Sequence, residues 1–183
     1  MRHPDIKLIL AIPGILMVFF GYVGCRLLNI PLADTSPEIA LFASLTAFFL
    51  AMATSVLFEQ HVPSFRLAGG YLEGIVGRLA LTPLWALALS LTSGIGEELF
   101  FRGLLLGLFG DFLPIWFAVL AQAVLFAAFH PAPRAAWGYT LWTGIIGVLF
   151  GVVTVASGSI IPTILAHYLF NHLNFEAALQ KPA

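Results

Sequence analysis

Long apolar runs are the feature that most constrains the fold of this chain. Six of them fill most of the sequence: residues 8–28, 39–58, 79–109, 115–129, 138–156 and 160–179. The hydrocarbon core of a bilayer is crossed by about 20 consecutive apolar residues in a helix. The sequence therefore predicts an all-α, polytopic transmembrane helix bundle of about six spans, forming a single membrane domain.

Composition supports lipid as the surrounding solvent. The 183 residues are 60% hydrophobic and 9% charged, whereas about 25% of residues are charged in an average soluble domain. So few charged side chains could not cover a soluble globule of this length. A net charge of −1 gives no sign of a nucleic-acid partner. The single cysteine, Cys25, excludes a disulfide framework and any Cys-based metal site.

The basic residues predict the orientation of the bundle. With six spans and the N-terminus inside, the cytoplasmic segments hold these basic residues: Arg2, Lys7, Arg66, Arg78, Arg134 and Lys181. The opposite side holds only Arg26, and Lys and Arg accumulate on the cytoplasmic side of membrane proteins. We therefore expect both termini in the cytoplasm. The first run is longer than the apolar part of a signal peptide, so we expect it to be retained.

The chain is expected to divide into two parts within that one membrane domain. Residues 1–78 are predicted to form two transmembrane helices and an interfacial loop over residues 59–78. Residues 79–183 are predicted to form the catalytic helical core. The third apolar run, roughly 31 residues, would extend about 46 Å as one helix, well beyond the bilayer core. A strong tilt would accommodate it, but Ser93-Gly94-Ile95-Gly96 favours a kink that places Glu97 at a helix N-terminus.

Three charged residues lie within that third run: Glu97, Glu98 and Arg102. A charged side chain at mid-membrane costs about 2.5–3.5 kcal/mol on insertion scales. Glu98 and Arg102 are four residues apart, so on a helix they share a face and can neutralise one another. Glu97 points about 100° away and has no partner nearby in sequence. A structural ion-pair cluster between helices is one interpretation, and a functional carboxylate is the default for an intramembrane acid.

Further polar residues lie in the later runs. His130 ends the fourth run just before Pro131, while His167 and Asn171 lie four apart in the sixth and so share a face. Taken singly, these would be an interfacial histidine and a helix–helix hydrogen-bond patch. Antiparallel neighbours joined by a short turn bring Glu97 and His130 to similar depth, however. We therefore expect Glu97, His130, His167 and Asn171 to converge around a buried, wet pocket.

This set of groups favours hydrolysis by an activated water molecule. A carboxylate beside a histidine can polarise water, and an imidazole N–H with an asparagine amide can stabilise an oxyanion. Cys25 is isolated in the first run, so no nucleophilic cysteine is evident. No cofactor is expected. Zinc remains an alternative, because two histidines and a glutamate are an ordinary catalytic zinc set, here Glu97, His130 and His167.

The motifs and their order resemble a known family. They are EExxxR at residues 97–102, FxxxH at 126–130 and HxxxN at 167–171. The pattern resembles the CPBP intramembrane proteases, also called the Abi family, which include CAAX prenyl endopeptidases and bacteriocin-processing or immunity proteins. The resemblance covers about residues 90–175 and extends to Gly96 and Gly103. Each motif alone is weak, whereas three in order within apolar helices are specific.

The resemblance implies a role for each matched residue. Glu97 would be the general base acting with His130 on water, and His167 and Asn171 would stabilise the oxyanion. Glu98 and Arg102 would support the site, and Phe126 would pack on the helix that carries His130.

The substrate implied is a membrane-anchored or C-terminally tagged protein or peptide, in a bacterial plasma membrane. Only two spans precede the motifs, fewer than in the prenyl endopeptidases, which favours a processing enzyme over a true prenyl-protein protease. A non-catalytic membrane immunity or binding protein on the same scaffold is the alternative from another class.

Overall fold

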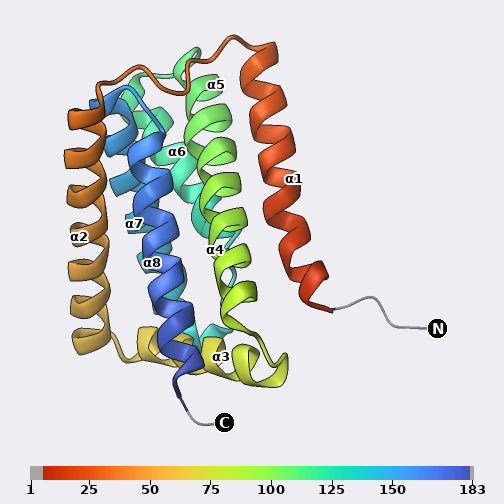
Figure 1. Cartoon of the computed structure of the whole chain (residues 1–183). Helices are drawn as coiled ribbons and strands as arrows, with labels where there is room; N and C mark the ends of the chain where they lie inside the picture. The colour runs from red at the N-terminus through yellow and green to blue at the C-terminus, as the bar shows by residue number, and fades with distance from the viewer. Residues whose placement is uncertain (1–5, 182–183) are drawn as a thin grey trace.

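The computed structural model describes residues 6–181, and within them the regular structure is helical (Figure 1). In chain order the elements are α1 (Ile6–Leu27), α2 (Pro37–His61), α3 (Pro63–Arg78), α4 (Pro83–Glu97), the π-helix η1 (Glu98–Leu105), α5 (Leu106–Gly110), α6 (Ile115–Ala128), the 3₁₀-helix η2 (Arg134–Ala136), α7 (Trp137–Ser157) and α8 (Ile161–Leu179). The one β-type pairing in the described range is an isolated bridge between Ala33 and Ser159. The all-α prediction is confirmed.

The long helices stand side by side, and α3 lies across one end of the bundle (Figure 1). Helix α4 packs between α1 and α8, while α6 packs against α7 and α2 against α8. The π-helix η1 contacts α1, α4, α5, α6 and α7. Residues carried by η1 are therefore surrounded by several helices, in the interior of the bundle.

Four segments are long and apolar enough to cross a membrane. They are Ile6–Leu27, Pro37–His61, Pro83–Gly110 and Arg134–Ser157, while Ile115–Ala128 is a shorter apolar helix. Large apolar side chains point outward from them, and Phe42 on α2 is 74% exposed. Such a surface is stable in lipid, so the chain is an integral membrane protein. Six spans and cytoplasmic termini stay predictions, and Arg2, used for the orientation, lies outside the described residues.

The predicted interfacial loop over residues 59–78 is wrong, because most of it is helical. Helix α2 continues to His61, and α3 begins at Pro63, where proline suits the first helical position. The inward face of α3 carries Leu72 and Val76, which pack in an apolar cluster with side chains of α1, α4 and α8. This tertiary packing outweighs the low helix propensity of the glycines in the segment.

The predicted helix break at residues 93–96 is also wrong. Helix α4 runs without a break through Glu97, and the helix changes from α to π at Glu98. The two glycines serve close packing instead of a helix end. A Cβ atom on Gly94 would lie 3.1 Å from the backbone nitrogen of Tyr168 in α8, and one on Gly96 would collide with the Gly14 carbonyl oxygen in α1. Glu97 therefore lies inside a continuous helix, and not at a helix N-terminus.

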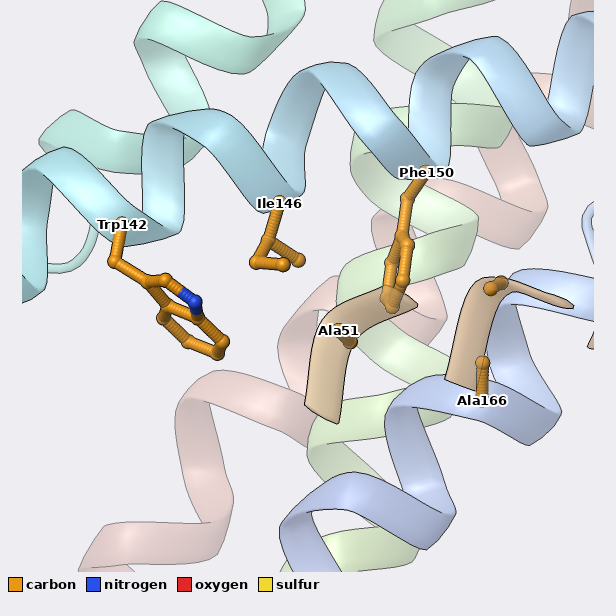
Figure 2. Close-up of a cluster of buried hydrophobic side chains, with 6 residues drawn as sticks. Ala51, Trp142, Ile146, Phe150 and Ala166 are labelled. Atoms are coloured by element: carbon orange, nitrogen blue, oxygen red, sulfur yellow. The ribbon is translucent and has the colours of Figure 1, made fainter. Parts of the chain in front are cut away.

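An apolar cluster holds α7 against α2 and α8. Large side chains of α7 (Trp142, Ile146 and Phe150) face the small residues Ala51 and Ala166 of the two neighbouring helices (Figure 2). The indole N–H of Trp142 also donates a hydrogen bond to the hydroxyl of Thr54, 3.3 Å away. Alternating large and small side chains let the three helices approach closely, which fixes the position of α8 and of the polar residues it carries.

Candidate active site

Glu98 and Arg102 form a buried ion pair on η1. The Nη1 atom of Arg102 donates to Oε1 of Glu98 over 2.9 Å, and both side chains are fully buried. The predicted i,i+4 pairing is confirmed. The Arg102 guanidinium also lies over the ring of Phe126, 4.1 Å from its centroid, and 5.4 Å from that of Phe150. Aromatic faces attract a buried guanidinium, so carboxylate and rings together compensate its charge.

The ring of His130 is oriented by a hydrogen bond to the backbone one turn earlier. Its Nδ1 atom lies 2.8 Å from the backbone oxygen of Phe126. A carbonyl oxygen only accepts hydrogen bonds, so Nδ1 carries the hydrogen and the other ring nitrogen is left for the site. That atom, Nε2, lies 3.3 Å from Oε2 of Glu97. The four-residue spacing of the FxxxH motif thus produces the contact that aims His130 at Glu97.

His167 lies between the two glutamates. Its Nδ1 atom is 2.8 Å from Oε1 of Glu98, and its Nε2 atom is 3.8 Å from Oε2 of Glu97. The ring also packs edge-on against Phe150, with centroids 5.9 Å apart. The contact between His167 and Glu98 was not foreseen from the sequence, because it depends on how α8 is rotated against η1.

Asn171 lies one turn after His167 on α8 and contacts α4. Its Nδ2 atom donates to the hydroxyl oxygen of Ser93 over 2.9 Å. Ser93 lies one turn before Glu97, on the same face of α4. Sequence reasoning assigned Ser93 to a kink and missed this contact, although a hydroxyl four residues before Glu97 was a usable signal.

The structure thus brings most of the sequence-predicted site residues together. Glu97 and the two imidazoles converge, Glu98 and Arg102 lie behind them, and Asn171 lies at the adjacent turn. The side chain of Glu97 is 14% exposed and that of His130 is 20% exposed, so this cluster is shielded but accessible. Cys25 lies apart on α1, where its thiol faces the Leu99 carbonyl oxygen at 4.0 Å.

Comparison with known protein families identifies a match that covers the site. The family described as type II CAAX prenyl endopeptidase, Rce1-like, matches residues 79–173. This range is more than half of the chain and contains Glu97, Glu98, Arg102, His130, His167 and Asn171. The chain belongs to the Rce1-like family. Searches among curated proteins and among solved structures gave no match.

Membership in the Rce1-like family confirms the resemblance drawn from the three motifs. It implies CAAX intramembrane protease activity, which agrees with the apolar helices of the bundle. Among residues 6–181, no group of three or more His, Cys, Asp or Glu side chains is arranged to hold a metal ion. The identity of the substrate and the role of each residue belong to the proposal that follows.

Proposed function

We propose that this Rce1-like protein hydrolyses a peptide bond in a membrane-associated or C-terminally tagged protein, using water activated by Glu97 and His130. The observation that carries the proposal is the 3.3 Å contact between Glu97 Oε2 and His130 Nε2, in a shielded site within the bundle. These two atoms, a carboxylate oxygen and an imidazole nitrogen, are both acceptors and are suited to take a proton from water.

The proton path follows from the tautomer of His130. Because Nδ1–H is committed to the Phe126 carbonyl, Nε2 presents a lone pair beside the Glu97 carboxylate. A water molecule at this point loses one proton to the pair formed by Glu97 and His130. Its oxygen then forms a bond to the substrate carbonyl carbon. The C–N bond then breaks, and the same proton passes to the leaving nitrogen. The products are a carboxylic acid and an amine, so atoms and charge balance.

The oxyanion that forms on the carbonyl oxygen needs hydrogen-bond donors. His167 supplies one from Nε2 when it is an imidazolium, since its Nδ1–H is held by Glu98. The Asn171 amide supplies the second donor. Removing one oxyanion donor typically lowers kcat about 100- to 1,000-fold.

The substrate class rests on the family. Rce1-like proteins are described as CAAX prenyl endopeptidases, and a CAAX box is a C-terminal Cys-aliphatic-aliphatic-X sequence with a prenylated cysteine. We propose a substrate anchored in the membrane and cut near its C-terminus, with the enzyme in a bacterial plasma membrane. No nucleic acid takes part.

A purified assay tests the hydrolysis. The protein is reconstituted in liposomes and given an internally quenched peptide that ends in a farnesylated CAAX box. We expect cleavage by the unaltered protein and a rate at least about 1,000-fold lower for Glu97→Gln, which keeps the shape but removes the base. Equal rates of cleavage for the two proteins would contradict the proposal, and no cleavage by either would contradict a prenylated CAAX substrate.

The same assay separates the glutamate mechanism from the zinc alternative. We propose that Glu97, His130 and His167 act without a metal. Activity should then survive dialysis against a strong chelator, and elemental analysis of the active protein should find no stoichiometric zinc. Loss of activity in chelator, restored by added zinc, would instead favour the metal-dependent version.

A further inference from the structure

Ser93 connects α4 to the amide of Asn171 through a short chain of hydrogen bonds. The hydroxyl of Ser93 donates to the backbone oxygen of Ser90 over 3.4 Å, and its oxygen accepts from Asn171 Nδ2 over 2.9 Å. In the described part of the chain, the Asn171 side chain makes no other hydrogen bond. Ser93 is thus the one group that sets how this carboxamide is turned.

The direction of these bonds fixes the orientation of the amide. A backbone carbonyl can only accept, so the hydroxyl hydrogen of Ser93 is used by Ser90. The Ser93 oxygen can then only accept from its other neighbour, which must present N–H and not C=O. The two ends of an asparagine amide have nearly the same shape, so such a partner decides between them. The second N–H on Nδ2 stays available for the site.

We propose that Ser93 is a positioning residue that keeps the N–H groups of Asn171 turned toward the reacting carbonyl. This inference rests on the proposed function, because it assigns a task to Ser93 in that reaction. Without the hydroxyl, the amide can rotate by 180° and present Oδ1 to the developing oxyanion. Oxygen facing oxyanion is repulsive, so the transition state loses its donor while substrate binding is little affected.

Kinetics on the farnesylated CAAX peptide test the proposal. Ser93→Ala should lower kcat about tenfold and leave KM unchanged, and Ser93→Thr should retain kcat because it keeps a hydroxyl that can bond back along the helix. Ser90→Ala is the matched control. Ser90 is a buried serine one turn earlier on α4, and its hydroxyl donates only to the carbonyl oxygen of Ala86, on its own helix. We expect its kcat to equal that of the unaltered protein.

A double variant adds a stricter condition. In an Asn171→Ala background, Ser93→Ala should cause no further loss of kcat, because it acts only through Asn171. Equal losses in Ser93→Ala and Ser93→Thr, or in Ser93→Ala and Ser90→Ala, would show general helix packing and overturn the proposal. Unchanged kcat in Ser93→Ala would also overturn it.

A spectroscopic measurement checks Ser93 without relying on catalysis. The chain has three asparagines, Asn29, Asn171 and Asn174, so side-chain amide signals in ¹⁵N-asparagine-labelled protein are few, and Asn171→Ala assigns one pair. In Ser93→Ala the chemical shifts of that pair should change and its amide hydrogens should exchange faster with solvent. Neither change should occur in Ser90→Ala. Unchanged Asn171 amide signals in Ser93→Ala overturn the role of Ser93, whereas absence of Glu97-dependent cleavage overturns the proposed function. The two failures are therefore distinguishable.

Discussion

Two adjacent glutamates in this protein have different surroundings and, we infer, different tasks. Glu98 is fully buried and contacts Arg102 and His167, so its negative charge is compensated on two sides. Glu97 is partly exposed and faces the Nε2 atoms of the two histidines. A buried carboxylate that contacts a guanidinium and an imidazole stabilises an arrangement, whereas a shielded carboxylate beside imidazoles can exchange a proton.

Stability measurements separate the two glutamates. Glu98→Gln leaves the buried Arg102 without its carboxylate, and breaking a buried pair by removing one partner typically costs about 3–5 kcal/mol. Glu97→Gln removes no such partner, so we expect its unfolding free energy to change by less than about 1 kcal/mol. Denaturant unfolding in detergent, followed by tryptophan fluorescence, measures both. Equal destabilisation of the two variants would contradict this division of tasks.

The oxyanion role gives a second prediction at the same scale. Asn171→Ala should lower kcat on the farnesylated CAAX peptide by about 100- to 1,000-fold, because a donor to the transition state is lost. Since the ground-state carbonyl needs this donor much less, KM should stay within about twofold. A variant that raises KM and keeps kcat would show that Asn171 binds substrate instead.

Sequence reasoning succeeded at this scale where the contact is local and failed where it is not. The Glu98–Arg102 pair follows from a four-residue spacing on one helix, and the structure contains it. The bond from His167 to Glu98 and the bond from Asn171 to Ser93 join residues about 70 to 80 positions apart. Such contacts depend on the rotation of one helix against another, which no local spacing specifies.

Among the elements, α1 supports the active site from behind. Gly21 of α1 lies directly against the backbone of η1, where a Cβ atom would be 2.7 Å from the carbonyl carbon of Leu99 and 2.8 Å from the nitrogen of Phe100. Two turns earlier, α1 is equally close to α4, since a Cβ on Gly14 would lie 2.9 Å from the backbone of Thr92. Small residues let membrane helices approach closely. Helix α1 therefore fixes η1, and with it Glu98 and Arg102.

A glycine comparison tests this support. Gly21→Ala should force α1 away from η1, destabilise the protein by about 1–3 kcal/mol as overpacking does, and lower activity. Gly70→Ala is the control, because an added Cβ there meets nothing within 4 Å. Alanine is preferred to glycine inside a helix, so the control should be slightly stabilised, by about 0.5–1 kcal/mol. Full activity and stability in Gly21→Ala would show that η1 is held by other contacts.

Elements were predictable in proportion to the strength of their apolar pattern. The six apolar runs all became helices, with ends within a few residues of those expected, because each run is long and bounded by turns. Helix α3 was missed because its glycines and charges resemble a loop, and its stability comes from packing against α1, α4 and α8. The π-helix was missed because residues 98–105 have no pattern that separates π from α.

For the whole molecule, lipid is the solvent that the composition and the exposed side chains require. A chain that is 9% charged and exposes large apolar side chains over several helices is stable only where its surroundings are apolar. The orientation in that lipid stays a prediction from the basic residues, most of which would share one side of a six-span arrangement.

A reporter fusion tests the orientation. With six spans and both termini in the cytoplasm, green fluorescent protein fused after residue 183 should fluoresce. Alkaline phosphatase at the same position should be inactive, because it needs the oxidising exterior for its disulfides. Fusions after residue 111, in the connection between α5 and α6, should give the opposite pattern. Active phosphatase at the C-terminus would contradict the predicted orientation.

The central claim is that this Rce1-like protein cuts membrane proteins at a site centred on Glu97. The most direct test compares the C-termini of membrane proteins, by mass spectrometry, in cells that produce either the unaltered protein or Glu97→Gln at equal levels. The account predicts a set of shortened C-termini that depends on Glu97, with the corresponding full-length proteins enriched on the purified variant. Identical C-termini in the two strains, with the cellular phenotype preserved by Glu97→Gln, would contradict it and favour a non-catalytic binding protein.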